Sequence, residues 1–456
     1  MTKEARGPND KEARKEPSSF DLSSFLRGSL FGFAVFIILA FYGCLAHARR
    51  EVDPTPLTQA DQGAYLAYAQ QMHDTHYAVA GDRNRMPVYP FLLSLVYQPG
   101  MSDAEFLARA QSFNINLSIL LLGLLFLILR RFFAAFHSVV LLVVAAFGVF
   151  IYRVGVVEVE PLYYFVSFCA FILLLRMLIT PRWWLAILAG AVTALAYLTK
   201  ASMLAAIPIW SAVFAAQTLW ECRARVRRRE IGWRLGHLLL VLGTFATIVF
   251  PYERTSKRLY GHYFFNVNSA YYMWCDSWPE AVAFTKAYRN NPDFPRDQVP
   301  SPAKYWREHS ATRIAGRFLH GLKTFATRSA KPTGYYKFVL FFALVGTVLA
   351  ARRWPLAWGL IRRELFATSF CFVFFFCYGL LYAWYDAVVT DSRFLLSLFL
   401  PFLFAASKFV LGLGQDRALA IMRRRISFTD FVAASLICLG LIDVAYNVLR
   451  IGRLIS

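Results

Sequence analysis

Acidic and basic side chains gather in a few short polar segments of an otherwise apolar chain. Asp61 and Arg85 follow the first apolar stretch, residues 29–48, with Asp82 and Arg83 between them. A carboxylate can act as a base or as a cation ligand, and an arginine can bind a phosphate through a bidentate fork. Together, beside a membrane surface, these residues predict chemistry on a lipid that carries a phosphate.

Three later segments carry ionisable residues that we expect near the same surface. Glu158 and Glu160 precede an apolar stretch, Lys200 separates two more, and Asp391 and Arg393 precede another. Ionisable groups at membrane depth are costly and therefore tend to be functional. We expect these segments to form one site, with anchoring at the membrane interface as the alternative role for each residue.

The composition indicates a membrane protein. Of the 456 residues, 58% are hydrophobic, and the mean hydropathy is +0.45, which is too apolar for an ordinary soluble domain. The expected fold is all-α and polytopic, with about eleven transmembrane helices, since the apolar runs approach or reach the length that crosses a bilayer. The predicted spans are residues 29–48, 114–129, 136–151, 161–176, 183–198, 203–219, 235–250, 338–351, 365–385, 394–413 and 428–449.

Arginine clusters between these spans set the expected orientation. The net charge is +21, and much of it comes from clusters that the positive-inside rule places in the cytoplasm, such as residues 223–234. This topology puts residues 49–110 and 251–335 outside and the N-terminus inside. It explains the charge with the lipid bilayer as partner and without nucleic acid, and the short loops favour a bacterial inner membrane.

The spans and loops divide the chain into four regions. Residues 1–28 are expected to be a disordered cytoplasmic tail, and residues 29–250 a transmembrane module that includes the outer loop 49–110 with an amphipathic helix at 57–72. Residues 251–335 form a second outer loop or small subdomain, and residues 336–456 carry the last spans. Within the second loop, residues 266–274 are rich in amides and aromatics, as sugar sites often are, although a folded surface subdomain is the favoured interpretation.

Four segments, in order, resemble the GT-C glycosyltransferases, and in particular the protein mannosyltransferase-like and aminoarabinose transferase-like enzymes. Residues 61–66 and 85–93 resemble the first outer loop of that family, and Glu160-Pro161 resembles the acidic start of its fourth span. Residues 188–202 resemble its hairpin with glycine and lysine. Residues 392–401 resemble its late span. The resemblance is good over residues 25–220 and weaker over 385–405.

This resemblance implies an inverting glycosyltransferase whose donor is a polyprenyl-phosphate sugar. Asp61 would be the general base that removes the proton of the acceptor hydroxyl. Arg85 and Lys200 would hold the departing phosphate, with Arg393 as a third contact. No metal or other cofactor is expected, because a lipid monophosphate is already a competent leaving group. The acceptor can be a lipid, a glycan or a protein. The residues expected to bind sugar or acceptor are Glu160, Tyr65 and Tyr89.

Two positions depart from the family pattern, and two other functions stay open. Gln62 stands where the family carries an acidic residue after the aspartate, and Met86 replaces the first proline of a pair. A transporter or flippase of lipid-linked sugars is one alternative, but transporters usually carry charges at the membrane midplane. An O-antigen ligase or polymerase-like enzyme is the other, and would use late-loop residues such as His309 and His320.

Overall fold

The chain is built almost entirely of helices. The computed structural model describes residues 22–59, 61–78, 84–223, 228–289, 294–328, 333–389, 391, 393–415, 417–421 and 424–455. Within these residues it contains nineteen α-helices, four short 3-10 helices and one two-stranded sheet. Asp82 and Arg83 lie outside the described residues, as does most of the expected N-terminal tail; the first helix, α1, already begins at Leu22.

The long apolar helices confirm a polytopic, all-α membrane architecture. Eight helical segments of the described chain are long and apolar enough to cross a membrane, and a ninth is obtained if one bent pair, whose members meet at 105°, counts as a span. Two further apolar helices are shorter. Each predicted span falls on these segments, and the count of about eleven stays a prediction. The helices are α1 (Leu22–Val52), α4 (Asp103–Leu129), α5 (Ala135–Gly148), α6 (Glu160–Ile179), α8 (Ala206–Arg223), α9 (Arg228–Tyr260), α16 (Leu365–Tyr385) and α19 (Phe428–Ile455), the bent pair α14 (Tyr336–Arg352) and α15 (Trp354–Arg363), and the shorter α7 (Trp183–Thr199) and α18 (Phe399–Gly414).

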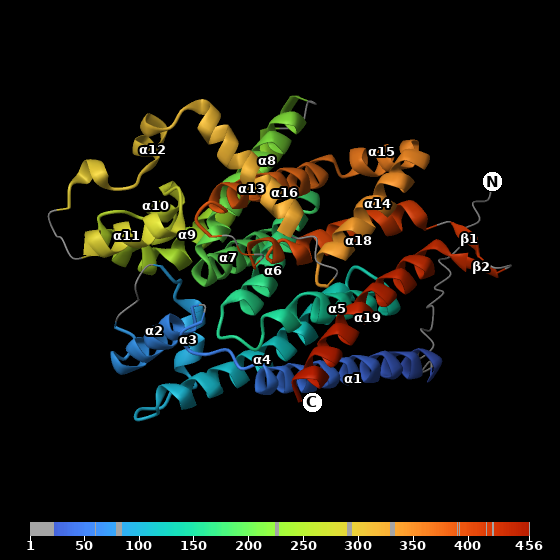
Figure 1. The fold of residues 1–456 in the computed structure, drawn as a ribbon. Helices are drawn as coiled ribbons and strands as arrows, with labels where there is room; N and C mark the ends of the chain where they lie inside the picture. Colours follow the sequence, from blue (N-terminus) through green and yellow to red (C-terminus); the bar gives the residue numbers. More distant parts are fainter. Residues whose placement is uncertain are drawn as a thin grey trace, which may run out of the picture.

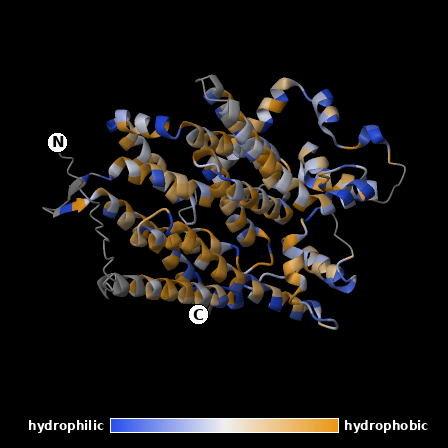
Figure 2. Ribbon diagram, turned by 180° about the vertical axis from the view of Figure 1, so that it is seen from behind, coloured by the Kyte–Doolittle hydropathy of each residue, from blue (hydrophilic) through white to orange (hydrophobic). Residues whose placement is uncertain are grey.

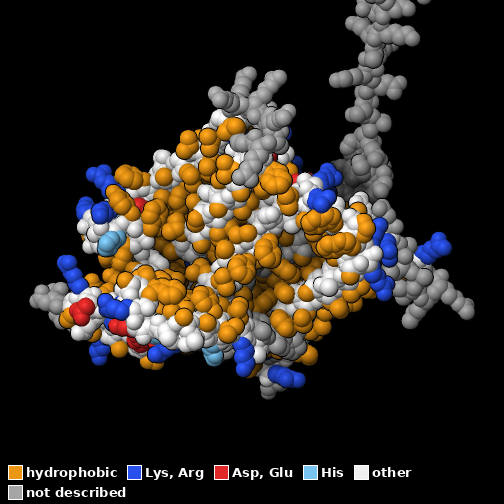
Figure 3. Space-filling view, turned by 90° about the horizontal axis from the view of Figure 1, so that it is seen from above, with side chains coloured by type: hydrophobic (Ala, Val, Ile, Leu, Met, Phe, Trp, Pro, Cys, Tyr) orange, Lys and Arg blue, Asp and Glu red, His pale blue; other side chains and the backbone are white. Residues whose placement is uncertain are grey.

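The surface has the pattern expected of a protein in a bilayer. Large apolar side chains such as Leu127, Leu239 and Phe372 are exposed on these helices. Hydrophobic residues follow the long helices and hydrophilic residues gather mainly at the two ends of the molecule (Figure 2). A broad hydrophobic face with lysine and arginine around its edge is visible from above (Figure 3). Since contiguous apolar patches of this kind are rare on soluble monomers, the face fits lipid.

Residues 49–110, the predicted first outer loop, contain two short helices in their described part, α2 (Gln62–Asp74) and α3 (Val88–Ser94). The amphipathic helix expected at 57–72 therefore begins later than predicted. Its start is delayed because the Gln62 amide donates hydrogen bonds to the carbonyls of Thr55 and Pro56, at 3.3 and 2.8 Å, and holds that segment in a turn.

The second outer region begins later than residue 251, because α9 continues through Pro251 to Tyr260. Four helices follow, and in Figure 1 the first three of them lie at the same end of the molecule as α2 and α3. The opposite end carries the small sheet, an antiparallel pair in which Ala418 faces Ser427. The additional elements are α10 (Val267–Ala270), α11 (Trp278–Arg289), α12 (Pro302–Glu308), α13 (Ala311–Arg328), β1 (Ala418–Ile421) and β2 (Arg424–Ser427).

Two glycines allow the close helix packing that frames the site. A Cβ at Gly190 on α7 would lie 2.5 Å from the carbonyl oxygen of Val241 on α9, so only glycine fits there. A Cβ at Gly321 on α13 would lie 2.0 Å from the carbonyl oxygen of Ala383 on α16. The first contact fixes the helix that ends at Lys200, and the second holds the outer region against the end of α16.

Candidate active site

A cavity of about 670 Å³ lies at the end of the molecule that carries both outer regions. Its wall is formed by the first outer loop, the start of α6, the turn between α7 and α8, the segment around α10, and the end of α16. Every site residue predicted from the sequence except Tyr89 lines it: Asp61, Tyr65, Arg85, Glu160, Lys200 and Arg393.

Helix boundaries place these side chains in the cavity wall. Asp61 directly precedes α2, and Arg85 lies shortly before α3. Glu160 is the first residue of α6, where Pro161 suits the first helical turn. Lys200 separates α7 from the 3-10 helix Ala201–Ala205, and Arg393 begins the short helix α17, Arg393–Leu396. Side chains from five distant parts of the chain thus meet at one surface.

Asp61 is held by two arginines. Arg85 donates from Nη2 to Oδ1 of Asp61 at 2.6 Å, and Arg393 donates from Nη1 to Oδ2 at 3.2 Å. Burial would raise the pKa of Asp61, but the charges of Arg85 and Arg393 outweigh it and hold that pKa below its usual value. The side chain remains 35% exposed, so the carboxylate is accessible from the cavity.

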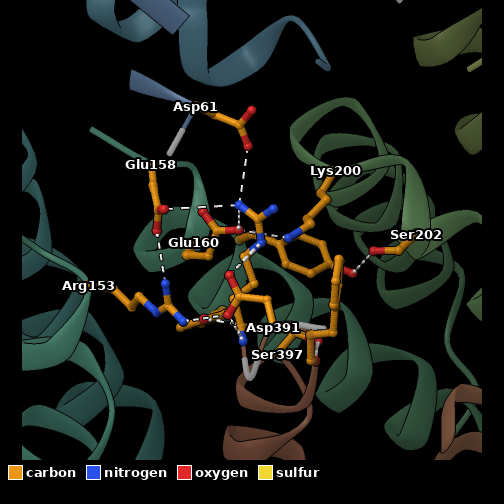
Figure 4. A network of polar contacts seen from close by, with 12 residues as sticks. Asp61, Arg153, Glu158, Glu160, Lys200, Ser202, Asp391 and Ser397 are labelled. Atoms are coloured by element: carbon orange, nitrogen blue, oxygen red, sulfur yellow. Dashed lines mark hydrogen bonds and ion pairs between the residues drawn. The ribbon is translucent and has the colours of Figure 1, made fainter. Parts of the chain in front are cut away.

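Arg393 is the centre of the charged cluster. The carboxylates that surround it, Asp61, Glu158, Glu160 and Asp391, are labelled in Figure 4. Besides contacting Asp61, the Arg393 guanidinium lies 3.2 Å from Asp391, 3.9 Å from Glu160 and 4.0 Å from Glu158. Burial would lower the pKa of Arg393, but these four carboxylates raise it above its usual value. The cluster therefore keeps one permanent cation in the cavity wall.

Lys200 is the second cation at this surface. Its Nζ donates to Oε1 of Glu160 at 2.9 Å and also lies 5.5 and 5.2 Å from the ring centroids of Tyr163 and Phe394. The turn after it is fixed by a 3.0 Å hydrogen bond between the hydroxyls of Ser202 and Tyr163. Glu160 itself is almost fully buried, and its Oε2 has no hydrogen-bond partner within the described part of the chain.

Arg153 belongs to the cluster and was missed by the sequence analysis. It donates to Asp391 at 2.8 Å and to Glu158 at 3.4 Å. The available signal was its place on the outer side of a span, where the positive-inside rule does not call for an arginine. Because it bridges the segment before α6 and the segment before α17, Arg153 holds two walls of the site together.

Among the described residues the cluster balances four carboxylates, Asp61, Glu158, Glu160 and Asp391, against four cations, Arg85, Arg153, Lys200 and Arg393. Glu158 is the member whose ionisation is most strained. Burial and the neighbouring charge of Glu160 raise its pKa to about 7, against the opposing effect of Arg153 and Arg393. An anionic ligand entering this site would therefore meet a cluster that can take up a proton near neutral pH.

The two predicted tyrosines have different places. Tyr65 lines the cavity, and the guanidinium of Arg85 lies 5.6 Å from its ring centroid. Tyr89 is fully buried, and its ring meets that of Tyr65 at 85° with centroids 5.1 Å apart. Tyr89 thus supports Tyr65 from behind and does not itself face the cavity in this structure.

Both departures from the family pattern have a structural explanation. Gln62 is fully buried, and besides its two donated hydrogen bonds its Oε1 accepts one from the backbone N–H of Val157 at 2.8 Å. A carboxylate could not donate to the two carbonyls, so this position needs an amide. Met86 lines the cavity, and its sulfur accepts a hydrogen bond from the hydroxyl of Tyr252 at 3.7 Å.

Amides and aromatic rings form another part of the cavity wall. Asn268 donates to the side chain of Asn84 at 2.6 Å and accepts from the hydroxyl of Tyr385 at 2.7 Å, which joins the first outer loop, α10 and α16. Residues 266–274, expected mainly as part of a surface subdomain, contribute directly to the cavity. Those that line it are Asn266, Asn268, Ser269, Tyr272 and Met273.

Histidines play no part in lining this cavity. His309 instead contacts Asp276 of the outer region at 2.9 Å. Within the described ranges no group of three or more histidine, cysteine, aspartate or glutamate side chains is arranged to hold a metal ion.

Comparison with known proteins adds no guide to function. No family model matches the chain, and neither a curated protein nor a solved structure is significantly similar to it. The function is therefore argued from the geometry of the site.

Proposed function

We propose that this protein is an integral membrane glycosyltransferase of GT-C type that transfers a sugar from a polyprenyl phosphate to an acceptor hydroxyl. The observation that carries the proposal is the meeting of Asp61 with Arg85, Arg393 and Lys200 in one cavity between the ends of apolar helices. A base and a set of phosphate-binding cations are the two elements that such a transfer requires.

The cavity suits a lipid phosphate because its wall has a charged part and an apolar part. Arg85, Lys200 and Arg393 offer cations to a phosphate. Leu204, in the 3-10 helix before α8, and Leu381, on α16, add hydrocarbon to the wall. A phosphate at a membrane interface is incompletely hydrated and needs fixed cations. The isoprenoid tail would follow the apolar wall into the bilayer.

In the proposed reaction the acceptor oxygen attacks the anomeric carbon of the donor in line with the phosphate. Asp61 accepts the hydroxyl proton as the new carbon–oxygen bond forms. The bond between the anomeric carbon and the phosphate oxygen breaks, and its electron pair stays on the phosphate. The products are the glycosylated acceptor and the polyprenyl phosphate, and the anomeric configuration is inverted.

The remaining roles follow from position. Glu160, Tyr65 and the amide wall around Asn268 surround the space next to Asp61, where sugar or acceptor hydroxyls would bind. The charges gather at one end of the helices, which favours an enzyme over a transporter with charges at the midplane. We place the protein in a bacterial inner membrane with its N-terminus in the cytoplasm, since the arginine clusters then lie inside.

The test is a mass-spectrometric comparison of cell-envelope glycans from cells with and without the protein. We expect one glycan modification to disappear and to return with the parent protein but not with Asp61→Asn. A return with Asp61→Asn would contradict the assigned base and favour a transporter. An unchanged glycan profile would contradict the proposal itself.

A further inference from the structure

Both oxygens of the Asp61 carboxylate contact an arginine. Arg85 lies 2.6 Å from Oδ1 and Arg393 lies 3.2 Å from Oδ2. A carboxylate held between two guanidinium groups is stabilised in its charged form and is a weak base. The residue that the proposed function uses as base is thus held in the least reactive state that the site can give it.

The same two arginines line the cavity in which the proposed function places the donor phosphate. A phosphate carries more acceptor oxygens than a carboxylate and binds arginine in the same bidentate manner. A lipid phosphate and Asp61 therefore compete for the same guanidinium nitrogens.

We propose that the donor phosphate displaces the Asp61 carboxylate from Arg85 and Arg393, so that binding of the donor itself switches on the base. This inference rests on the proposed function and adds an obligatory order, in which the donor binds before the acceptor can react. With its two cations neutralised by phosphate, Asp61 loses the interactions that lower its pKa, while burial and the charge of Glu160 still raise it.

The surrounding contacts allow this exchange without a large movement. Arg393 keeps Asp391 at 3.2 Å and Glu160 at 3.9 Å after Asp61 is released, so its guanidinium stays in place. Lys200 stays paired with Glu160 and adds a third cation at the same wall. Within the described part of the chain, the Asp61 side chain accepts no capping hydrogen bond from the start of α2, so its movement leaves that helix intact.

The test measures binding of a short-chain polyprenyl monophosphate to the full chain purified in detergent. Asp61→Asn removes the competing carboxylate, and we expect it to bind the probe about tenfold tighter than the parent, the effect of one charge-assisted hydrogen bond made available to the ligand. Asp61→Ser should behave in the same way. The combination with Arg85→Ala should lose the gain. Asp74→Asn, a matched change on the outward side of α2, should leave the affinity unchanged.

A general loss of negative charge could also strengthen binding of an anion, and Glu158→Gln separates the two explanations. Glu158 lies 4.0 Å from Arg393 but makes no contact shorter than that with it. Measured above pH 7, where Glu158 is charged, this variant should gain much less than Asp61→Asn. Equal gains in the two variants would overturn the exchange.

The outcomes for the exchange and for the proposed function are distinct. If both Asp61 variants fold, as judged by thermal melting, and bind the probe no tighter than the parent, the exchange is wrong even where glycosyl transfer is lost. Tighter binding without any glycosyl transfer by the parent would support the exchange and contradict the proposed enzyme. If neither parent nor variant binds the probe, both are overturned.

Discussion

Among the described residues, two buried charged clusters differ in how their carboxylates are satisfied. In the first, around Arg393, Asp61 and Glu160 line a cavity, and Glu160 Oε2 has no hydrogen-bond partner in the described part of the chain. In the second, Asp443 on α19 accepts hydrogen bonds from the backbone of Gly334 at 2.6 Å, from the Tyr152 hydroxyl at 2.9 Å, and from Lys337. The Asp443 side chain is completely buried and lies away from the cavity.

The difference shows why burial of charge alone is a poor guide to function. The Asp443 cluster satisfies one carboxylate with three donors and lines no part of the cavity, which is the arrangement expected of a structural ion pair. The Arg393 cluster has equal numbers of opposite charges, a partly exposed carboxylate at Asp61 and an adjoining cavity. We therefore expect substitutions in the Asp443 cluster to change stability and substitutions in the Arg393 cluster to change activity.

The largest effect is expected from Lys337→Met. This change keeps the length of the side chain but leaves Asp443 without its cation in a fully buried position. Removing one partner of a buried ion pair costs about 3–5 kcal/mol of the free energy of unfolding. Thermal melting in detergent would measure the loss, with the exposed Lys286→Met as control. An unchanged melting temperature would show that the Asp443 cluster is not structural.

Asp61→Asn is expected to lower turnover by about a hundredfold or more, because the site loses its base. The melting temperature should change little, since Arg393 retains its other carboxylates. The measurement is transfer from a polyprenyl-phosphate sugar by the purified protein. Transfer near the parent rate would place the base elsewhere.

Arg85→Ala and Lys200→Ala should each weaken donor binding by about 1–3 kcal/mol, because each removes a charged donor to the phosphate. Arg85→Lys should recover only part of the loss, since lysine lacks the bidentate fork. The measurement is the affinity of correctly folded variants for the donor. If both alanine variants bind as tightly as the parent, these residues are interfacial anchors and Arg393 is the next candidate.

The smallest effect is a pH dependence of stability that originates at Glu158. Burial and Glu160 raise its pKa from 4.5 to about 7 in the folded protein. Between these values the folded state binds more protons than the unfolded state, so this residue's contribution to stability falls as the pH rises through that window. In Glu158→Gln, the melting temperature should change less with pH over that range than it does in the parent. If the melting temperature of parent and variant depended on pH in the same way, the pKa of Glu158 would not be raised in the folded protein.

The helices could be predicted because apolar runs of sufficient length leave few alternatives, but their ends could not. The second span begins at Asp103 and not near residue 114, because Ser102 and Glu105 form a capping box in a polar segment that hydropathy does not register. The later start of α2 likewise depends on hydrogen bonds made by Gln62.

Individual residues of the candidate site could be predicted from the sequence, whereas the ion pairs between them could not. Asp61 and Arg393 are 332 residues apart, and only the packing of the helices brings them into contact. The predicted shared membrane side narrowed the candidates to a set from which six residues line the cavity, Asp61, Tyr65, Arg85, Glu160, Lys200 and Arg393. Arg153 was not predicted, because a single arginine at the end of a span looks the same in sequence as an interfacial anchor. Only the structure shows its partners, Glu158 and Asp391.

The three hydrogen bonds of Gln62 have a consequence for the entropy of substrate binding. They tie residues 55–56 to the backbone just before Glu158, so the loop that carries Asp61 and the segment that carries the glutamates are joined before any ligand arrives. Less conformational freedom then remains to be lost when donor and acceptor bind. With an amide at position 62, the loop before Asp61 is more rigid, and in the proposed reaction Asp61 is the single base.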